Sequence, residues 1–551
     1  GARYRYRLDG EDFPDPCSRS QPEGVHGPSE VVDPRTFEWH DSGWTPPERE
    51  ELVIYEAHIG TLTPGGTFGS AIGELPRLAD LGITAIELMP VASFPGRWNW
   101  GYDAVDIFAP TAVYGRPEGL RRFVDAAHQA GIAVILDVVY NHLGPSGNYT
   151  GRYAREYLTA RHQTPWGDAL NFDDRGCKGV RRFFRENLLH WVHEYHIDGF
   201  RFDATNAISD QSDHHILAEL AESVHQYPRA GHVPYLFAET DENDVRYLRP
   251  LAEGGYGFDG VWADDFHHAV RTILTPGREG YLGSYSGQID ELAATIERGF
   301  LYEGQVDPYT NGPRGTPARE QPWRQFVYAI QNHDQIGNQA LGLRLGQIAS
   351  LGDTLAATTL LLLLPATPLI FQGQEFAAST PFLYFTDHEP ELGRSITEGR
   401  RNEFAAFGAF SDPGMREEIP DPQAESTFQN SVLRAEEANY GAGRITLAYH
   451  RELLRLRRDD PVLRASRRGR PPIRTWFADR ALVVQVSDGA EGHRWIAVNF
   501  GEETRVLVEG PDHEWESVLC SNEARFGGSG HVPRISGGAL LIPAHCGALM
   551  R

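Results

Sequence analysis

An arginine and an aspartate lie two residues apart in an otherwise apolar run, at Arg201 and Asp203. In a β-strand, residues i and i+2 point to the same side, so both side chains would face one polar pocket. The guanidinium would keep the carboxylate ionised, and an ionised carboxylate held in place can act as a nucleophile. The same pair could equally be a structural ion pair at a strand end. The neighbouring elements must decide between these two interpretations.

Eight apolar, strand-like runs alternate with helical patterns from residue 51 onward, which predicts an α/β fold built on a (β/α)8 TIM barrel. The runs are Leu52–Ile59, Ile83–Val91, Ile132–Tyr140, Ile197–Thr205, Tyr235–Thr240, Val261–Phe266, Phe326–Gln331 and Pro368–Gln372. Helical periodicity over Pro117–Ala130 and Val180–Tyr195 supports helices between them. A doubly wound sheet would need a glycine-rich phosphate loop after its first strand, and Thr63-Pro-Gly-Gly66 is not one.

The patterns on either side of the barrel divide the chain into three parts. Residues 1–45 indicate the remnant of an N-terminal β-domain and a linker, and residues 46–470 hold the barrel. Short alternating strands over residues 471–551 predict a C-terminal all-β domain, a β-sandwich. Three connections are long for βα loops, which predicts a small insertion at 143–176 and further insertions at 281–322 and 377–439.

Composition limits the possible partners. The net charge of −25 argues against nucleic acid and against an anionic membrane surface. The chain has no apolar run long enough to span a membrane and no signal peptide at its start. Its four cysteines are scattered, without metal-site spacing, as expected of reduced thiols. We therefore expect a cytoplasmic protein that acts on a neutral ligand.

Each predicted strand ends in polar or titratable residues. In a (β/α)8 barrel, the active site lies at these C-terminal strand ends. A lone aspartate or histidine there is commonly a polar cap. A ring of carboxylates and imidazoles on one rim would be costly as mere structure, because like charges repel in a partly dry pocket. The ring therefore predicts an active site. It comprises His58, Asp103, Asp137–His142, Arg201–Asp203, Glu239–Asp241, Asp264–His268, Asn332–Asp334 and Glu375.

Four of these stretches resemble the four ordered sequence regions of the α-amylase superfamily, glycoside hydrolase family 13. They are Asp137–His142, Gly199–Asp203, Glu239 and Asn332–Asp334. The resemblance implies a retaining glycoside hydrolase in which Asp203 is the nucleophile and Glu239 is the acid and then the base. Asp334 would be the third carboxylate, which grips ring hydroxyls in the transition state. Glu239 must begin protonated, so we expect its pKa to be raised.

The resemblance also implies roles around the attacked sugar. His142 and His333 would donate hydrogen bonds in the transition state, Tyr102 would stack beneath the sugar, and Arg201 would orient Asp203. For Asp137, positioning of Arg201 and plain barrel support remain open. The remaining residues expected to bind substrate are Asn206, Asp264, Asp265, His267, His268, Gln335 and Asn338.

Finer features bear on the substrate. Amylases commonly carry Lys-His after the nucleophile region, where this chain has Asn206-Ala207. The stretches 264–268, 331–338 and 380–388 are similar to those of family members that cut the α-1,4 bond next to the terminal trehalose of maltooligosyl trehalose. This implies that maltooligosyl trehalose and related α-glucans are the partners and trehalose is the product. The alternatives are a branching or amylase-type activity on α-glucan, or a non-catalytic barrel, which usually lacks one of the three carboxylates.

The resemblance raises the question of a structural metal. In many amylases an asparagine in the position of Asn141 helps to bind calcium, with further ligands from the subdomain after strand three. Here that subdomain offers only Asp173-Asp174, late in its loop. We therefore expect no metal and no cofactor.

Overall fold

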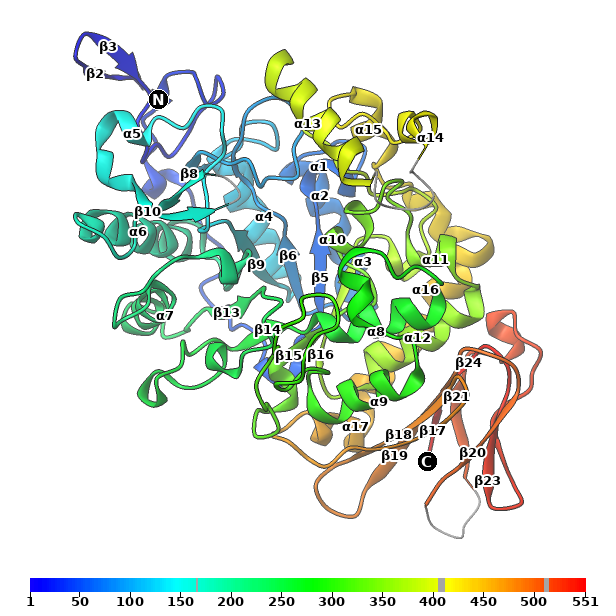
Figure 1. Cartoon of the computed structure of the whole chain (residues 1–551). Coiled ribbons are helices and arrows are strands. Elements are labelled where there is room, and N and C mark those ends of the chain that lie inside the picture. The colour runs from blue at the N-terminus through cyan, green and yellow to red at the C-terminus, as the bar shows by residue number, and fades with distance from the viewer. Residues whose placement is uncertain (165–166, 405–411, 510–514) are drawn as a thin grey trace.

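The structure, a computed structural model, describes residues 1–164, 167–404, 412–509 and 515–551. Eight parallel strands close a barrel at its centre (Figure 1), which confirms the predicted (β/α)8 fold. Each predicted strand overlaps one barrel strand. In barrel order they are β5 (Ile54–Ala57), β6 (Ala85–Leu88), β9 (Ala133–Val138), β12 (Gly199–Phe202), β13 (Tyr235–Ala238), β14 (Gly260–Trp262), β15 (Phe326–Tyr328) and β16 (Thr367–Phe371).

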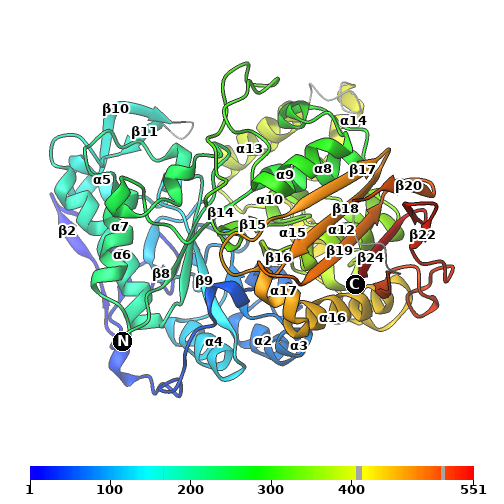
Figure 2. The same cartoon turned by 90° about the horizontal axis from the view of Figure 1, so that it is seen from below.

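Helices cover the outside of the barrel, as Figures 1 and 2 show. Proline at the first helical position begins α4 (Pro117–Gln129), where its missing N–H costs nothing, and the apolar face of α4 is buried as predicted. The apolar stripe of α6 (Cys177–Tyr195) is likewise buried. The other long helices around the barrel are α7 (Ile216–Gln226), α8 (Asp264–Leu274), α12 (Leu351–Leu363) and α16 (Gly441–Asp459).

All eight predicted strands extend past the ends of the observed ones, and in two of them the difference bears on the site. The sixth ends at Trp262, and Asp264 and Asp265 form the first turn of α8, where carboxylates interact favourably with the helix dipole. The seventh ends at Tyr328, and α10 (His333–Gly337) begins after Asn332, whose side chain accepts a hydrogen bond of 2.8 Å from the backbone N–H of Gln335. Helix starts, rather than strand ends, therefore present these residues.

The three predicted insertions have structure of their own. The first contains α5 (Thr150–Tyr153) and the hairpin of β10 (Leu158–Thr164) and β11 (Gly167–Leu170). The second contains α9 (Ile289–Arg298). The third contains α13 (Pro390–Glu403), α14 (Pro413–Glu417) and α15 (Glu425–Asn430), and its residues 405–411 lie outside the described residues. The proposed domain boundaries stay predictions.

The C-terminal region forms two antiparallel sheets. One has the order β17-β18-β19-β24-β21 and the other β20-β23-β22. Val483 of β18 and Leu540 of β23 belong to one core shared by the two sheets, so they pack as the predicted sandwich. Val484 of β18 points to the opposite face and joins the core of the barrel. The strands are β17 (Arg474–Ala478), β18 (Ala481–Ser487), β19 (His493–Asn499), β20 (Thr504–Leu507), β21 (Ser517–Cys520), β22 (Arg534–Ser536), β23 (Ala539–Ile542) and β24 (Cys546–Met550).

The N-terminal segment forms two small ribbons. The strand β1 (Arg3–Tyr4) pairs with β4 (Ser29–Glu30), and β2 (Tyr6–Leu8) pairs with β3 (Glu11–Phe13). This segment lies beside α5 in Figure 1, and the hydroxyl of Tyr153 donates a hydrogen bond of 2.6 Å to the carbonyl of Pro14. Within the described ranges, no helix is long and apolar enough to cross a membrane.

Candidate active site

Arg201 is the centre of the polar network inside the barrel. Its side chain is fully buried, and its Nη1 donates hydrogen bonds of 2.7 Å to Asp203 and 2.8 Å to Asp137. Its Nη2 lies 3.4 Å from Oε2 of Glu239, and the guanidinium lies 4.4 Å from the ring centre of Trp262. Because β12 pairs with β9 on one side and β13 on the other, one cation faces carboxylates from three neighbouring strands.

Two donors fix the carboxylate of Asp203. Arg201 binds Oδ1, and the side-chain amide of Asn141 donates 2.8 Å to Oδ2 and 2.9 Å to the backbone carbonyl. The Asp203 side chain remains 14% exposed, whereas that of Arg201 is not exposed. The carboxylate is therefore oriented from behind and accessible from the front, as a nucleophile must be.

Glu239 follows β13 and is suited to proton transfer. Its Oε2 accepts a hydrogen bond from the backbone N–H of Ala204, and its side chain is 19% exposed. Burial, together with the nearby carboxylates of Asp203 and Asp334, outweighs Arg201 and raises the pKa of Glu239 to about 7. A carboxyl group with this pKa can donate a proton and later accept one near neutral pH.

The start of α10 brings Asp334 and His333 to the same place. Nε2 of His333 lies 3.3 Å from Oδ1 of Asp334, which also accepts a hydrogen bond of 3.2 Å from Asn338. Burial favours the neutral acid, but His333 and Arg201 outweigh it and lower the pKa of Asp334 to about 2. Asp334 is therefore an acceptor that stays ionised at neutral pH.

Tyr102 and His142 complete the inner ring. The hydroxyl of Tyr102 donates 2.7 Å to Asp137 and lies 2.7 Å from Nε2 of His333, and its ring stacks on the imidazole. Nε2 of His142 lies 2.9 Å from the backbone carbonyl of Tyr102, and its Nδ1 contacts Asn141. Burial raises the pKa of Asp137 to about 6 despite the nearby Arg201.

A cavity of about 560 Å³ opens beside these residues. Glu239 and Asp334 line it, as do four of the predicted substrate-binding residues, Asp264, His268, Gln335 and Asn338. Asp203, Tyr102, His142, Arg201 and His333 lie outside its lining. Arg201 contacts Glu239 of the lining, and His333 contacts Asp334. A larger groove of about 1060 Å³ adjoins it and shares Tyr281, Tyr309 and Asn338.

Three further predicted substrate-binding residues also lie away from the cavity wall. Asn206 is exposed and donates 2.9 Å to Asp241, a cavity residue. Asp265 is fully buried and accepts hydrogen bonds from Tyr285 (2.6 Å) and Asn243 (2.7 Å). His267 is also buried, and its Nε2 lies 3.8 Å from Asp264. The stretch is a helix, in which Asp264 and His268 lie four residues apart on one face, and Asp265 and His267 are turned away from the cavity wall.

Sequence motifs missed much of the cavity lining. Trp262 lies on a barrel strand but was not distinguishable from a core aromatic. Another group comes from the loops after β13 and the insertion at 281–322, where no periodic pattern marks a wall-forming residue. This group is Glu242, Asp244, Tyr281, Ser284, Tyr285, Asp307, Tyr309, Thr310, Pro313, Arg314, Gly315 and Thr316.

The residues present do not fit a calcium site at Asn141. Both ends of its amide are used, by Asp203 and by His142. Within the part of the chain that the structure describes, no group of three or more His, Cys, Asp or Glu side chains could hold a metal ion.

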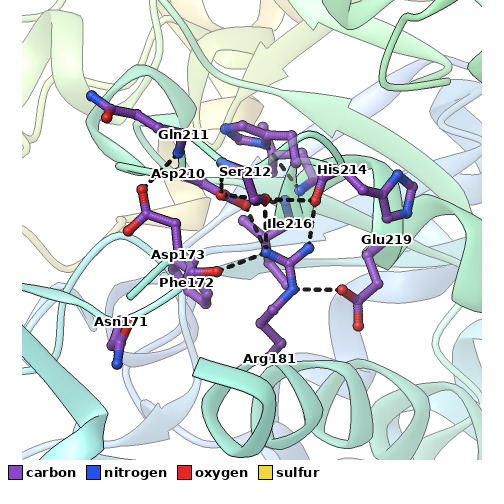
Figure 3. Close-up of polar contacts among 12 residues, drawn as sticks. Asn171, Phe172, Asp173, Arg181, Asp210, Gln211, Ser212, His214, Ile216 and Glu219 are labelled. Carbon is purple, nitrogen blue, oxygen red and sulfur yellow. Dashed lines mark hydrogen bonds and ion pairs between the residues drawn. The ribbon is translucent and has the colours of Figure 1, made fainter. Parts of the chain in front are cut away.

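The positively charged side chain of Arg181 lies between the insertion after β9 and the loop after β12. Figure 3 shows its guanidinium at the centre of a set of oxygen acceptors. It donates 2.8 Å to the carbonyl of Phe172, 2.8 Å to Asp210, 2.6 Å to the carbonyl of His214 and 2.6 Å to Glu219. Carbonyl and carboxylate oxygens are the ligands that calcium prefers, but here they converge on a guanidinium.

We expect chelation of divalent metals to leave activity and Tm unchanged. R181M should lower the free energy of unfolding by about 3 kcal/mol, because Asp210 would keep a buried charge without its cationic partner. Urea unfolding measures this difference. R182M is the matched control, since Arg182 is an exposed residue of the same helix, 3.7 Å from Glu186, and its loss should cost less than about 0.5 kcal/mol. A Tm that falls with chelator, or an R181M protein restored by calcium, would contradict this account.

The geometry defines a class of protein. A (β/α)8 barrel that gathers Asp203, Glu239 and Asp334 around one buried arginine is a glycosidase barrel of the α-amylase type, and a family model described as the α-amylase catalytic domain matches residues 13–166. The malto-oligosyltrehalose trehalohydrolase of Deinococcus radiodurans is 47% identical, over 92% of this chain and 82% of that protein. That of Saccharolobus solfataricus is 42% identical, over 83% and 78%. The chain belongs to the malto-oligosyltrehalose trehalohydrolase family.

Solved structures agree with the α-amylase-type fold. A putative α-amylase from Salmonella typhimurium matches with a TM-score of 0.89 and 38% identity, covering 100% of this chain and 90% of that one. Apo pullulanase from Paenibacillus barengoltzii matches with a TM-score of 0.69 and 20% identity, covering 100% and 84%, and this likeness shows the fold alone.

Proposed function

We propose that the protein is a retaining hydrolase that cleaves the α-1,4-glucosidic bond next to the terminal trehalose of maltooligosyl trehalose and releases trehalose in the cytoplasm. The observation that carries this proposal is the pairing of Asp203 and Glu239 on Arg201, with Glu239 on the cavity wall. The names of the relatives supply the substrate.

The reaction follows from the two carboxylates. Asp203 attacks the anomeric carbon while the protonated Glu239 donates its proton to the glycosidic oxygen, so the C–O bond breaks and a glycosyl ester with Asp203 forms. Glu239, now a carboxylate, takes a proton from water, which attacks the same carbon and releases Asp203. Two inversions retain the configuration. This role predicts that the carboxyl groups of Asp203 and Glu239 lie about 5–5.5 Å apart.

The cavity suits the leaving trehalose unit. It lies on the side of Glu239, which protonates the leaving oxygen, and Asp241 and Glu242 offer acceptors for sugar hydroxyls. Trp262 and Tyr309 offer apolar faces. Asn338 binds Asp334, which would hold the attacked sugar, and also lines the adjoining groove. We therefore assign that groove to the glucan chain on the other side of the bond.

Product analysis tests this function. Wild-type protein should cleave maltooligosyl trehalose to trehalose and a maltooligosaccharide, with kcat/KM about 10²-fold above that for the linear maltooligosaccharide of equal length, because the linear chain leaves polar groups of the cavity unpaired. Chromatography of the products after timed digestion measures both rates. D203N protein, purified in parallel, controls for contaminating amylases. Equal kcat/KM for the two substrates would point instead to an amylase-type enzyme.

A further inference from the structure

Glu56 is a buried carboxylate that the proposed reaction does not use. It lies on β5, opposite Glu87 of β6, and both side chains are 1% exposed. Both of its oxygens contact His333, which lies 277 positions away in the chain. Oε2 accepts a hydrogen bond of 3.1 Å from the backbone N–H of His333, and Oε1 contacts Nδ1 of the imidazole. A buried carboxylate is costly unless it is paired, so this contact fixes His333 at two points.

The hydrogen bonds around His333 determine its protonation. The hydroxyl of Tyr102 has one hydrogen and donates it to Asp137, so its oxygen is an acceptor for Nε2 of His333. The other neighbour of Nε2 is the carboxylate of Asp334, also an acceptor. Nδ1 faces the carboxylate of Glu56, so each ring nitrogen has a hydrogen-bond acceptor as its neighbour. Both nitrogens therefore carry a hydrogen.

We propose that Glu56 is a positioning residue that holds His333 as a doubly protonated imidazolium between Tyr102 and Asp334. Glu56 touches no substrate and acts through His333. The pKa of His333 agrees with this role: burial would lower it, but Asp334 and Glu56 hold it well above its ordinary value. A charged donor makes a shorter and stronger hydrogen bond than a neutral one.

The contacts extend from Glu56 to the nucleophile. Glu56 binds His333, Nε2 of His333 meets Tyr102, Tyr102 donates to Asp137, and Arg201 joins Asp137 to Asp203. Each link sets the direction of the next, so a His333 without its Nε2 hydrogen would leave the oxygen of Tyr102 only the longer contact of 3.5 Å from Arg201. The titratable groups that face His333 from all surrounding elements are Glu56, His58, Glu87, Tyr102, Asp137 and Asp334, with Arg201 beyond Asp137.

The matched pair of variants is E56Q and E87Q. Oε2 of Glu87 has no hydrogen-bond partner among the described residues, and burial raises its pKa well above the ordinary range. Burial therefore favours the neutral acid, which glutamine resembles in shape and charge. We expect E56Q to lower kcat about 10- to 100-fold with a smaller change in KM, and E87Q to leave both within about 2-fold.

The pH profile separates positioning from mere support. Without the carboxylate, the pKa of His333 should fall, and the ratio of E56Q to wild-type kcat should decline as pH rises from about 5 to 8. E56D keeps the charge, so the ratio of E56D to wild-type kcat should not change with pH. E56D is also the variant to use if E56Q does not fold. A flat ratio for E56Q, or a loss in E87Q equal to that in E56Q, would overturn the proposal.

Proton NMR provides a measurement that needs no variant at Glu56. Wild-type protein should show a low-field ring N–H signal that persists well above pH 6.5, the ordinary range for histidine, and H333Q should lack it. A signal that titrates away at about pH 6.5 would contradict the role of Glu56.

The inference rests on the proposed function only for the identity of the substrate. The kcat ratios are taken on whichever α-glucan the wild type cleaves fastest, so a failure of the trehalose specificity leaves them interpretable.

Discussion

Replacement of Asp203 by asparagine is expected to lower kcat by about 10⁴- to 10⁶-fold, the range seen when an enzyme loses its nucleophile. The asparagine side chain would keep an acceptor for Arg201, so the network that orients it largely remains. It would lose the negative charge that attacks the anomeric carbon, and no glycosyl ester could form. Initial rates of trehalose release, followed over hours at high protein concentration, measure the effect.

Two comparisons make the D203N result specific. D80N changes an exposed carboxylate on α3 (Leu75–Leu81), paired with Arg451 at the surface, and should retain the wild-type rate. Thermal unfolding should show that D203N stays folded at the assay temperature. Turnover of D203N within about 10-fold of wild type would exclude Asp203 as the nucleophile.

The barrel and the central pair were predictable because their signals are local. Apolar runs mark strands that are buried on both faces, and the two-residue spacing predicts that Asp203, directly after β12, points to the same side as Arg201. What could not be known from the pair alone was its surroundings. The parallel pairing of β12 with β9 and β13 brings Asp137 and Glu239 to Arg201 from positions 64 residues before it and 38 after it.

The rest depended on contacts between distant segments. The stretch 264–268 was expected to end a strand, yet it begins α8, so only its first and last residues reach the cavity. Glu56 looks like an ordinary interruption of an apolar strand, and only the closed barrel shows that His333 meets it. Arg181 interrupts the apolar stripe of α6, and nothing local indicates that four acceptors from three segments converge on it.

The activity should fall as pH rises through about 7, because Glu239 must be protonated in the free enzyme to act as the acid. The pKa of Glu239 is raised, so the acid form persists at neutral pH, and log kcat/KM should decline by about one unit per pH unit above the inflection. E239Q should lower kcat/KM by about 10²- to 10⁴-fold and abolish that inflection, since glutamine does not titrate. Assays across pH 5 to 9 with maltooligosyl trehalose, corrected for protein stability, measure both effects.

A substrate that needs no acid separates Glu239 from Asp203. In a maltooligosyl fluoride, the leaving fluoride departs without a proton, so E239Q can still form the glycosyl ester but cannot activate water to release it. We expect E239Q to release a burst of about one equivalent of fluoride and then stall, whereas D203N should release none. Mass spectrometry of the stalled E239Q protein should place the sugar on Asp203. A burst in D203N would contradict the role of Asp203, because it would place the nucleophile elsewhere. Steady turnover of the fluoride by E239Q would contradict the role of Glu239, because it would show that water is activated without it.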